Sequence, residues 1–168
     1  MAKVHAIRIH QTGGPEAMRW EEVEVGEPVP GQVRIRHKAV GLNYIDTYHR
    51  SGLYPLTLPS GIGLEGAGVV EAVGVGVSEF KPGDRAGYCS GPVGAYAEAR
   101  LFPADRLIKL PAGIDDRTAA AMLHAGAGEY AAADHRPLAC RKREGAEAAR
   151  GAVEAGGAGC RADAAHPA

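Results

Sequence analysis

Short stretches of alternating hydrophobic and polar residues recur through the first two thirds of the chain. The clearest lies at residues 33–39, where Val33, Ile35, His37 and Ala39 alternate with three basic residues. Successive side chains of a strand point to opposite faces, so this period of two predicts a strand with one face toward the core. Similar patterns and apolar runs predict further strands at residues 4–10, 18–25, 67–75, 94–101 and 106–110.

Two helices are predicted between these strands. Residues 43–51 have the composition of a short helix, with Asn43 as its cap and Gly52 at its end. A second helix is expected to begin near Asp116. Tight turns containing glycine and proline separate the strands, as at Gly13-Gly14-Pro15 and at 81–84. Many short strands with few helices predict a mainly β fold, a compact and partly open β-barrel.

The segment from 124 to 168 has a different composition. It is rich in alanine, glycine and arginine, and its only branched aliphatic residues are Leu138 and Val153. Such a segment buries too little apolar surface to offset its chain entropy, so we expect a poorly structured tail. The predicted organisation is therefore a folded domain at 1–123 followed by this tail.

Composition excludes some functional classes. The formal net charge is −1, which gives no electrostatic reason to expect a nucleic acid or membrane partner. No apolar run reaches the ~18 residues that would span a bilayer. The three cysteines, Cys89, Cys140 and Cys160, show no paired spacing and are expected to be reduced. We therefore expect a soluble, cytoplasmic protein.

The segment from Gly41 to Gly87 combines features in an unusual order. A short helix rich in polar and aromatic residues leads to the glycine-framed 63–66, then to an apolar strand and a Lys-Pro-Gly-Asp turn at 81–84. The chain from Ala2 to Leu123 closely resembles the N-terminal, GroES-like domain of the zinc-free quinone oxidoreductases, in the medium-chain dehydrogenase/reductase superfamily. The resemblance implies a GroES-like, partly open barrel and hydride transfer from NADPH to a quinone.

The resemblance also implies site residues on the first helix. Asn43 and Asp46 would help to place the nicotinamide and its ribose, and Tyr48 would touch the quinone or the nicotinamide ring. Tyr54 would form the far wall of the substrate pocket. Phenol rings suit this task because they offer a flat apolar face and a hydroxyl. The spacing alone equally allows Asn43 to be only a cap and Tyr48 only a packing residue.

No catalytic zinc is expected. In the zinc-dependent alcohol dehydrogenases of this superfamily, a cysteine follows the third strand and a Gly-His-Glu segment provides the next ligand. Here Asn43 and Leu64 stand at those positions, and neither side chain is a workable zinc ligand. Glu65 is expected to have a structural role, hydrogen-bonded to the backbone.

A dinucleotide-binding fingerprint should follow a strand and open a helix. The glycine-rich stretch at 156–159 has neither neighbour and is attributed to composition. We therefore expect the Rossmann domain to be missing and the chain alone to have negligible activity, with an exposed cleft that favours self-association.

One hypothesis for the tail is a frameshift in a GC-rich gene, which DNA resequencing would test; a naturally shortened protein is the other. Two alternative functions remain: one half of a split enzyme, or a small module that binds an apolar ligand.

Overall fold

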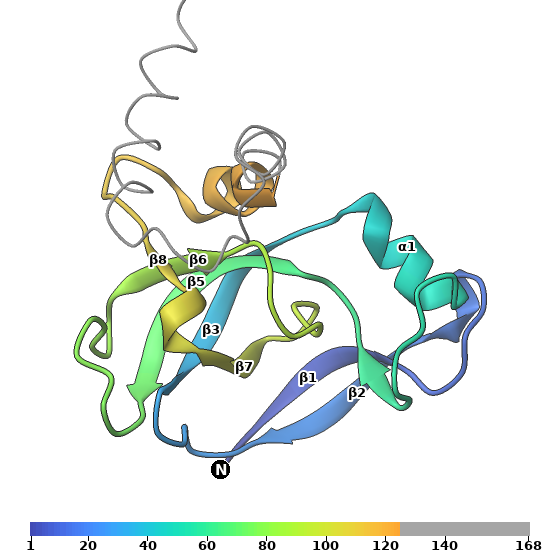
Figure 1. Ribbon diagram of the computed structural model, residues 1–168, viewed down its shortest axis with the longest axis horizontal. Coiled ribbons are helices and arrows are strands. Elements are labelled where there is room, and N and C mark those ends of the chain that lie inside the picture. Colours follow the sequence, from blue (N-terminus) through green and yellow to red (C-terminus); the bar gives the residue numbers. More distant parts are fainter. Residues whose placement is uncertain (125–168) are drawn as a thin grey trace, which may run out of the picture.

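The computed structural model describes residues 1–124. They form a mainly β domain of two antiparallel sheets that do not close into a barrel (Figure 1). The first sheet has the order β2-β1-β4, with β1 at Ala2–Ile9, β2 at Met18–Val25 and β4 at Ser60–Gly61. The predicted tail, the cysteines at 140 and 160 and the glycine-rich 156–159 lie outside the described residues.

The second sheet has five strands in the order β7-β3-β5-β6-β8. Its strands are β3 at Gln32–Gly41, β5 at Glu65–Val73, β6 at Arg85–Tyr88, β7 at Ala99–Pro103 and β8 at Ile108–Lys109. Helix α1, Tyr44–Ser51, follows β3, and 3-10 turns occur at Pro15–Ala17 and Ala104–Arg106. The mainly β, partly open architecture predicted from the sequence is confirmed.

Some predicted boundaries are wrong. The strand expected at 67–75 begins two residues earlier and ends two earlier, and the strand expected at 94–101 begins only at 99. Residues 94–96 instead bond across to the segment before β5, where the Gly94 and Ala95 N–H groups donate to the Gly63 carbonyl. Strands β4 and β6 were not expected. They are short and lack an alternating apolar pattern, and pairing with neighbouring strands alone defines them.

The main core lies against the second sheet. The side chain of Tyr88 stacks on Phe102 with ring centroids 4.0 Å apart, and the guanidinium of Arg100 lies over both rings. Other fully buried apolar residues of this core are Val33, Ile35, Val70, Ala86 and Ala95. Burial of Val33 and Ile35 confirms that this face of the 33–39 pattern points inward.

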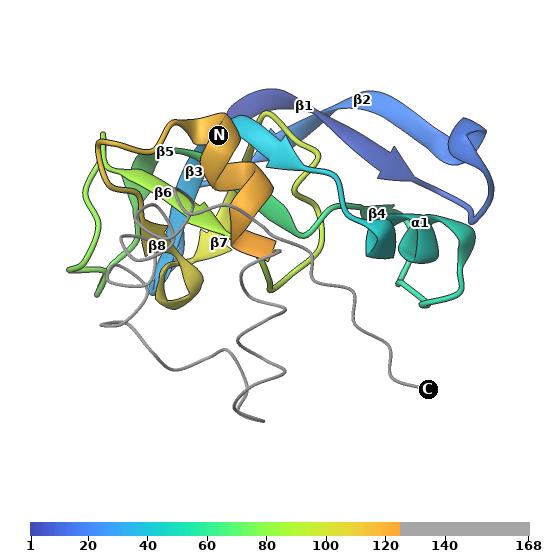
Figure 2. The same cartoon turned by 90° about the horizontal axis from the view of Figure 1, so that it is seen from above.

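A second helix, which the structure describes from residue 116 to residue 124, packs on β5 and β6 away from α1 (Figure 2). Asp115 caps it, since its Oδ1 accepts the N–H groups of Arg117 and Thr118 at 2.9 Å each. The guanidinium of Arg85 on β6 pairs with Asp116 at 2.7 Å. The helix predicted near Asp116 is confirmed. Among the described residues, no helix is long and apolar enough to cross a membrane.

We expect Gly68→Ala to lower the free energy of unfolding by about 2 to 3 kcal/mol. A Cβ atom at Gly68 would lie 2.0 Å from the carbonyl oxygen of Arg36 on the neighbouring strand, so β3 and β5 would have to separate. Urea denaturation measures the loss. Gly26→Ala is the matched control, because a Cβ there meets nothing within 4 Å. Equal stability of the two variants would contradict the close approach of the strands.

Candidate functional site

Helix α1 begins directly after β3, so the strand fixes where its first turn lies. Asn43 precedes the helix in extended conformation, and its backbone N–H donates to Oδ2 of Asp46 at 3.0 Å. Gly52 ends the helix with a φ of 86°, a left-handed conformation that glycine adopts without a steric cost. The predicted helix and its two end residues are confirmed.

The side chain of Asn43 is bonded to Glu65, the first residue of β5. Its amide nitrogen donates to Oε2 of Glu65 at 2.9 Å, and Oε1 of Glu65 accepts the backbone N–H of His124 at 2.6 Å. Glu65 is 2% exposed. One buried carboxylate thus joins the start of α1 to the second helix. The structural role expected for Glu65 is confirmed, although the sequence did not indicate its bond to Asn43.

Asp46 lies inside the domain and is 3% exposed. Besides the Asn43 N–H, its Oδ2 accepts the hydroxyl proton of Tyr96 at 2.7 Å. Its other oxygen, Oδ1, is buried and has no hydrogen-bond partner among the described residues. Burial, and then the bond and charge of Asp46, raise the pKa of Tyr96, so this phenol stays protonated and keeps donating.

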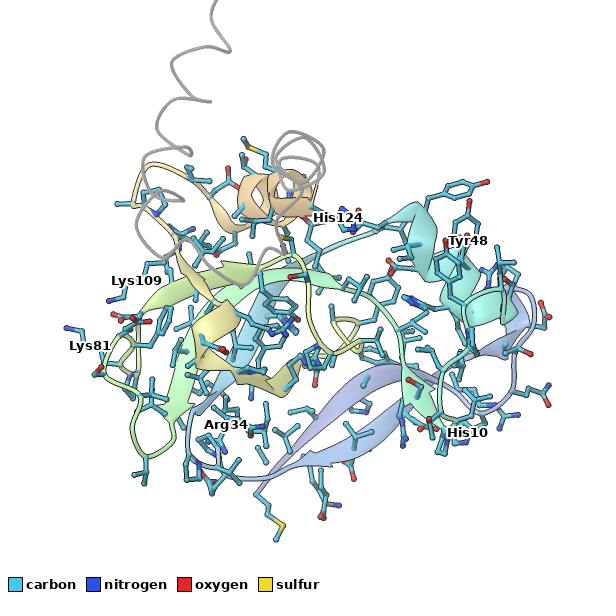
Figure 3. All side chains as sticks on the ribbon, in the orientation of Figure 1. His10, Arg34, Tyr48, Lys81, Lys109 and His124 are labelled. Carbon is cyan, nitrogen blue, oxygen red and sulfur yellow. The ribbon has the colours of Figure 1, made fainter. Side chains whose placement is uncertain are left out.

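Three tyrosines of α1 and the loop after it form an aromatic cluster, here called the tyrosine cluster: Tyr44, Tyr48 and Tyr54. The Tyr48 ring lies 5.4 Å from each of the other two, edge to face. Tyr44 is 77% exposed and Tyr54 is 48% exposed. Figure 3 shows Tyr48 on the α1 side of the domain, away from Lys81 and Lys109. The cluster therefore offers apolar aromatic surface to a ligand.

The buried ring of His49 adjoins the cluster. Its centroid lies 6.1 Å from that of Tyr54, and the rings meet edge to face. Its Nδ1 is buried without a hydrogen-bond partner in the described part of the chain. The structure thus brings together Tyr48 and Tyr54, and separately Asn43 and Asp46. Their roles with quinone and nicotinamide stay predictions.

A cavity of about 290 Å³ lies where β3 meets the second helix. Asn43 and Glu65 form part of its wall and Arg117 contributes a cationic side chain, whereas Tyr48 and Tyr54 do not line it. Its remaining lining residues are Ala39, Val40, Gly41, Leu42, Ala120 and Ala121. Asn43 therefore has a polar bond in the interior and also lines this cavity.

The side chains of Asn43, Leu64 and Cys89 do not form a favourable metal site. The Asn43 amide donates its N–H to Glu65, and Leu64 has no ligand atom. Burial, followed by the charge of Glu65, raises the pKa of the Cys89 thiol to about 11, so the thiol is neutral near pH 7. Residues 1–124 contain no group of three or more candidate metal ligands. A zinc-free site stays a prediction.

Comparison with known proteins identifies the family. Residues 29–112 match the model of the alcohol dehydrogenase GroES-like domain. The chain belongs to this family. Several curated relatives and solved structures that it is similar to are quinone oxidoreductases.

The relatives are similar over about two thirds to four fifths of the chain. A quinone oxidoreductase of Pseudomonas aeruginosa is 51% identical over 121 residues, which are 71% of this chain and 37% of that protein. The structure of Escherichia coli quinone oxidoreductase complexed with NADPH has a TM-score of 0.75 and 41% identity, covering 79% of this chain and 40% of that one. A 2-haloacrylate reductase of Burkholderia is 51% identical over 116 residues, 67% of this chain and 35% of that enzyme. The chain thus spans little more than a third of the length of these curated relatives.

Two features of the site were missed from the sequence. Tyr96 lies fifty positions from Asp46, and His124 donates a backbone N–H that no side-chain pattern reveals. Tyr96 follows a Gly-Ala pair within a stretch read as ordinary strand. No local periodicity signals a bond across such a distance.

Proposed function

We propose that this domain forms the substrate side of an NADPH-dependent quinone oxidoreductase that works without zinc. The tyrosine cluster is the observation that carries the proposal: three aromatic rings, two of them exposed, lie together in a chain that is similar to quinone oxidoreductases. A quinone is flat and largely apolar, with two carbonyl acceptors. Rings such as Tyr48 and Tyr54 complement both properties.

The residues of this chain have a binding and orienting role in the reaction. NADPH supplies the hydride when bound, and the quinone takes up that hydride and a proton to become a hydroquinone. Tyr48 and Tyr54 would hold the ring of the quinone and shield it from water. Asn43, fixed by Glu65 and beside the cavity, would present its amide group to the nicotinamide side of the site.

Cofactor binding is expected to need a further part of the enzyme. No glycine-rich G-x-G-x-x-G turn joins a strand to a helix within residues 1–124. We therefore propose that the chain alone reduces quinones negligibly. Titration with NADPH, followed by thermal shift, is expected to show no saturable stabilisation; saturable stabilisation would contradict this part of the proposal.

A chimera tests the catalytic proposal itself. Residues 1–124 would be joined to the NADPH-binding part of the Escherichia coli relative, and NADPH oxidation would be followed with tetramethyl-1,4-benzoquinone as substrate. We expect turnover by the chimera and none by either part alone. A folded chimera that binds NADPH but reduces no quinone would contradict the proposed function. Activity on mixing the separate parts would instead support a split enzyme.

In that chimera, Tyr48→Ala is expected to lower kcat/KM for the quinone by roughly tenfold to a hundredfold. The change removes the central ring of the tyrosine cluster, and one lost aromatic contact of this kind is worth about 1 to 3 kcal/mol. Trp20→Ala is the matched control, because Trp20 is an aromatic residue that stacks on His5 on the first sheet instead. Equal losses in the two variants would remove Tyr48 from the site.

Self-association through the exposed cleft stays a prediction. Exposed apolar side chains, Leu42 at 86% and Met122 at 39%, support it. The alternative of a small apolar-ligand module would be favoured if the chain binds quinone while the folded, NADPH-binding chimera reduces none.

A further inference from the structure

The tyrosine cluster depends on α1, and α1 is a short helix. Eight residues do not form a stable helix by themselves in water, so its position must come from contacts with the rest of the domain. Only two residues of α1 are buried, Asp46 and His49. The polar contacts of Asp46 are therefore a large part of what fixes the helix.

Tyr96 is a suitable anchor because its own position is fixed on both sides. Its carbonyl accepts the N–H of Ile7 on β1 at 2.7 Å, and its N–H donates to the carbonyl of Ile62 at 3.1 Å. Its ring also lies against the backbone of Gly63, where a Cβ atom would be 2.5 Å from the ring. The hydroxyl is thus held at the end of a rigid side chain.

The hydroxyl of Tyr96 donates to the carboxylate of Asp46, which has few other hydrogen-bond partners. Oδ2 of Asp46 accepts from Tyr96 and from the backbone of Asn43, and Oδ1 has no partner in the described part of the protein. The chain of bonds continues through the Asn43 amide to Glu65. Tyr96, Asp46, Asn43 and Glu65 therefore form a continuous polar path from the segment between the sheets, across the first turn of α1, to β5.

We propose that Tyr96 is a positioning residue for quinone binding: its hydroxyl, through Asp46, holds the first turn of α1 and so orients Tyr48 and Tyr54. The quinone part of this inference rests on the proposed function. Without the hydroxyl, the buried Asp46 carboxylate keeps one donor, and the first turn of α1 shifts to find another. The aromatic rings then lose their fixed orientation before the fold is lost.

The first test measures amide hydrogen exchange in α1 and needs no ligand. In Tyr96→Phe, amide hydrogen exchange within α1 is expected to accelerate roughly tenfold to a hundredfold, while exchange in β3 and β5 stays close to that of the native protein. Tyr88→Phe is the matched control, since it removes a buried tyrosine hydroxyl that is bonded to His37 instead. Uniform acceleration across both sheets, or none in α1, would overturn the positioning role.

The second test measures how tightly the protein binds a quinone. Binding of tetramethyl-1,4-benzoquinone to the full chain, followed by NMR shifts of α1 amides, is expected to weaken roughly tenfold in Tyr96→Phe and in Asp46→Ala, since alanine has no acceptor for the Tyr96 hydroxyl. The double variant should be little weaker than either single one, because both changes break the same bond. Additive losses would overturn the coupling. Absence of quinone binding by the native chain would contradict the proposed function, while the exchange test would still decide the role of Tyr96 in holding α1.

Discussion

Glu65→Gln is expected to lower the free energy of unfolding by about 3 kcal/mol. The two oxygens of Glu65 each accept one hydrogen bond, from the Asn43 amide and from the His124 backbone, and the residue is 2% exposed. A glutamine of the same size can accept only one of them and turns an N–H group toward the other donor. The lost bond and the unpaired buried donors account for the expected size of the effect.

The variant is also expected to loosen the site. Asn43 loses the side-chain partner that joins α1 to β5, so exchange of α1 amides should accelerate along with the drop in stability measured by urea denaturation. Glu24→Gln, on the exposed side of β2, is the matched control and should change stability by less than about 0.5 kcal/mol. If Glu65→Gln is as stable as the native chain, Glu65 does not carry the link between the helices.

As the pH drops from 6.5 to 4, the free energy of unfolding is expected to fall by about 3 kcal/mol in addition to the loss that protonation of carboxylates causes. Burial lowers the pKa of His37 from 6.5 to about 4, opposed by its bond to the Ala97 carbonyl and assisted by Arg100. Between pH 4 and pH 6.5, His37 is protonated in the unfolded chain but not in the folded protein. The contribution of His37 is therefore complete above pH 6.5 and is lost as the pH falls through this window.

The position of His37 explains its resistance to protonation. Its Nδ1 lies 2.6 Å from the Ala97 carbonyl, and its Nε2 lies 2.7 Å from the Tyr88 hydroxyl, so the neutral ring satisfies one acceptor and one donor. His37→Gln can keep a donor and an acceptor but does not titrate. Urea denaturation between pH 4 and 7 should give a flatter curve for this variant than for the native chain. Parallel curves, or an NMR titration of His37 near 6.5, would contradict the prediction.

The sequence predicted most of the fold because most of its signals are local. Alternation at 33–39 requires only that neighbouring side chains point to opposite faces, and Val33 and Ile35 are indeed buried. The ends of α1 follow from Asn43 and Gly52 through the backbone chemistry of single residues. The errors fall on β4, β6 and residues 94–98, where pairing with distant strands decides the conformation.

By itself, then, the sequence determined the β architecture, helix α1 and the presence of Tyr48 and Tyr54 close together after β3. Only the tertiary structure decided what lies beneath them. Tyr96 reaches Asp46 across fifty positions, and Glu65 joins Asn43 to His124 across two elements. Hydrogen bonds between buried groups depend on the distance between atoms in space, which local patterns do not encode, and these bonds hold the site in place.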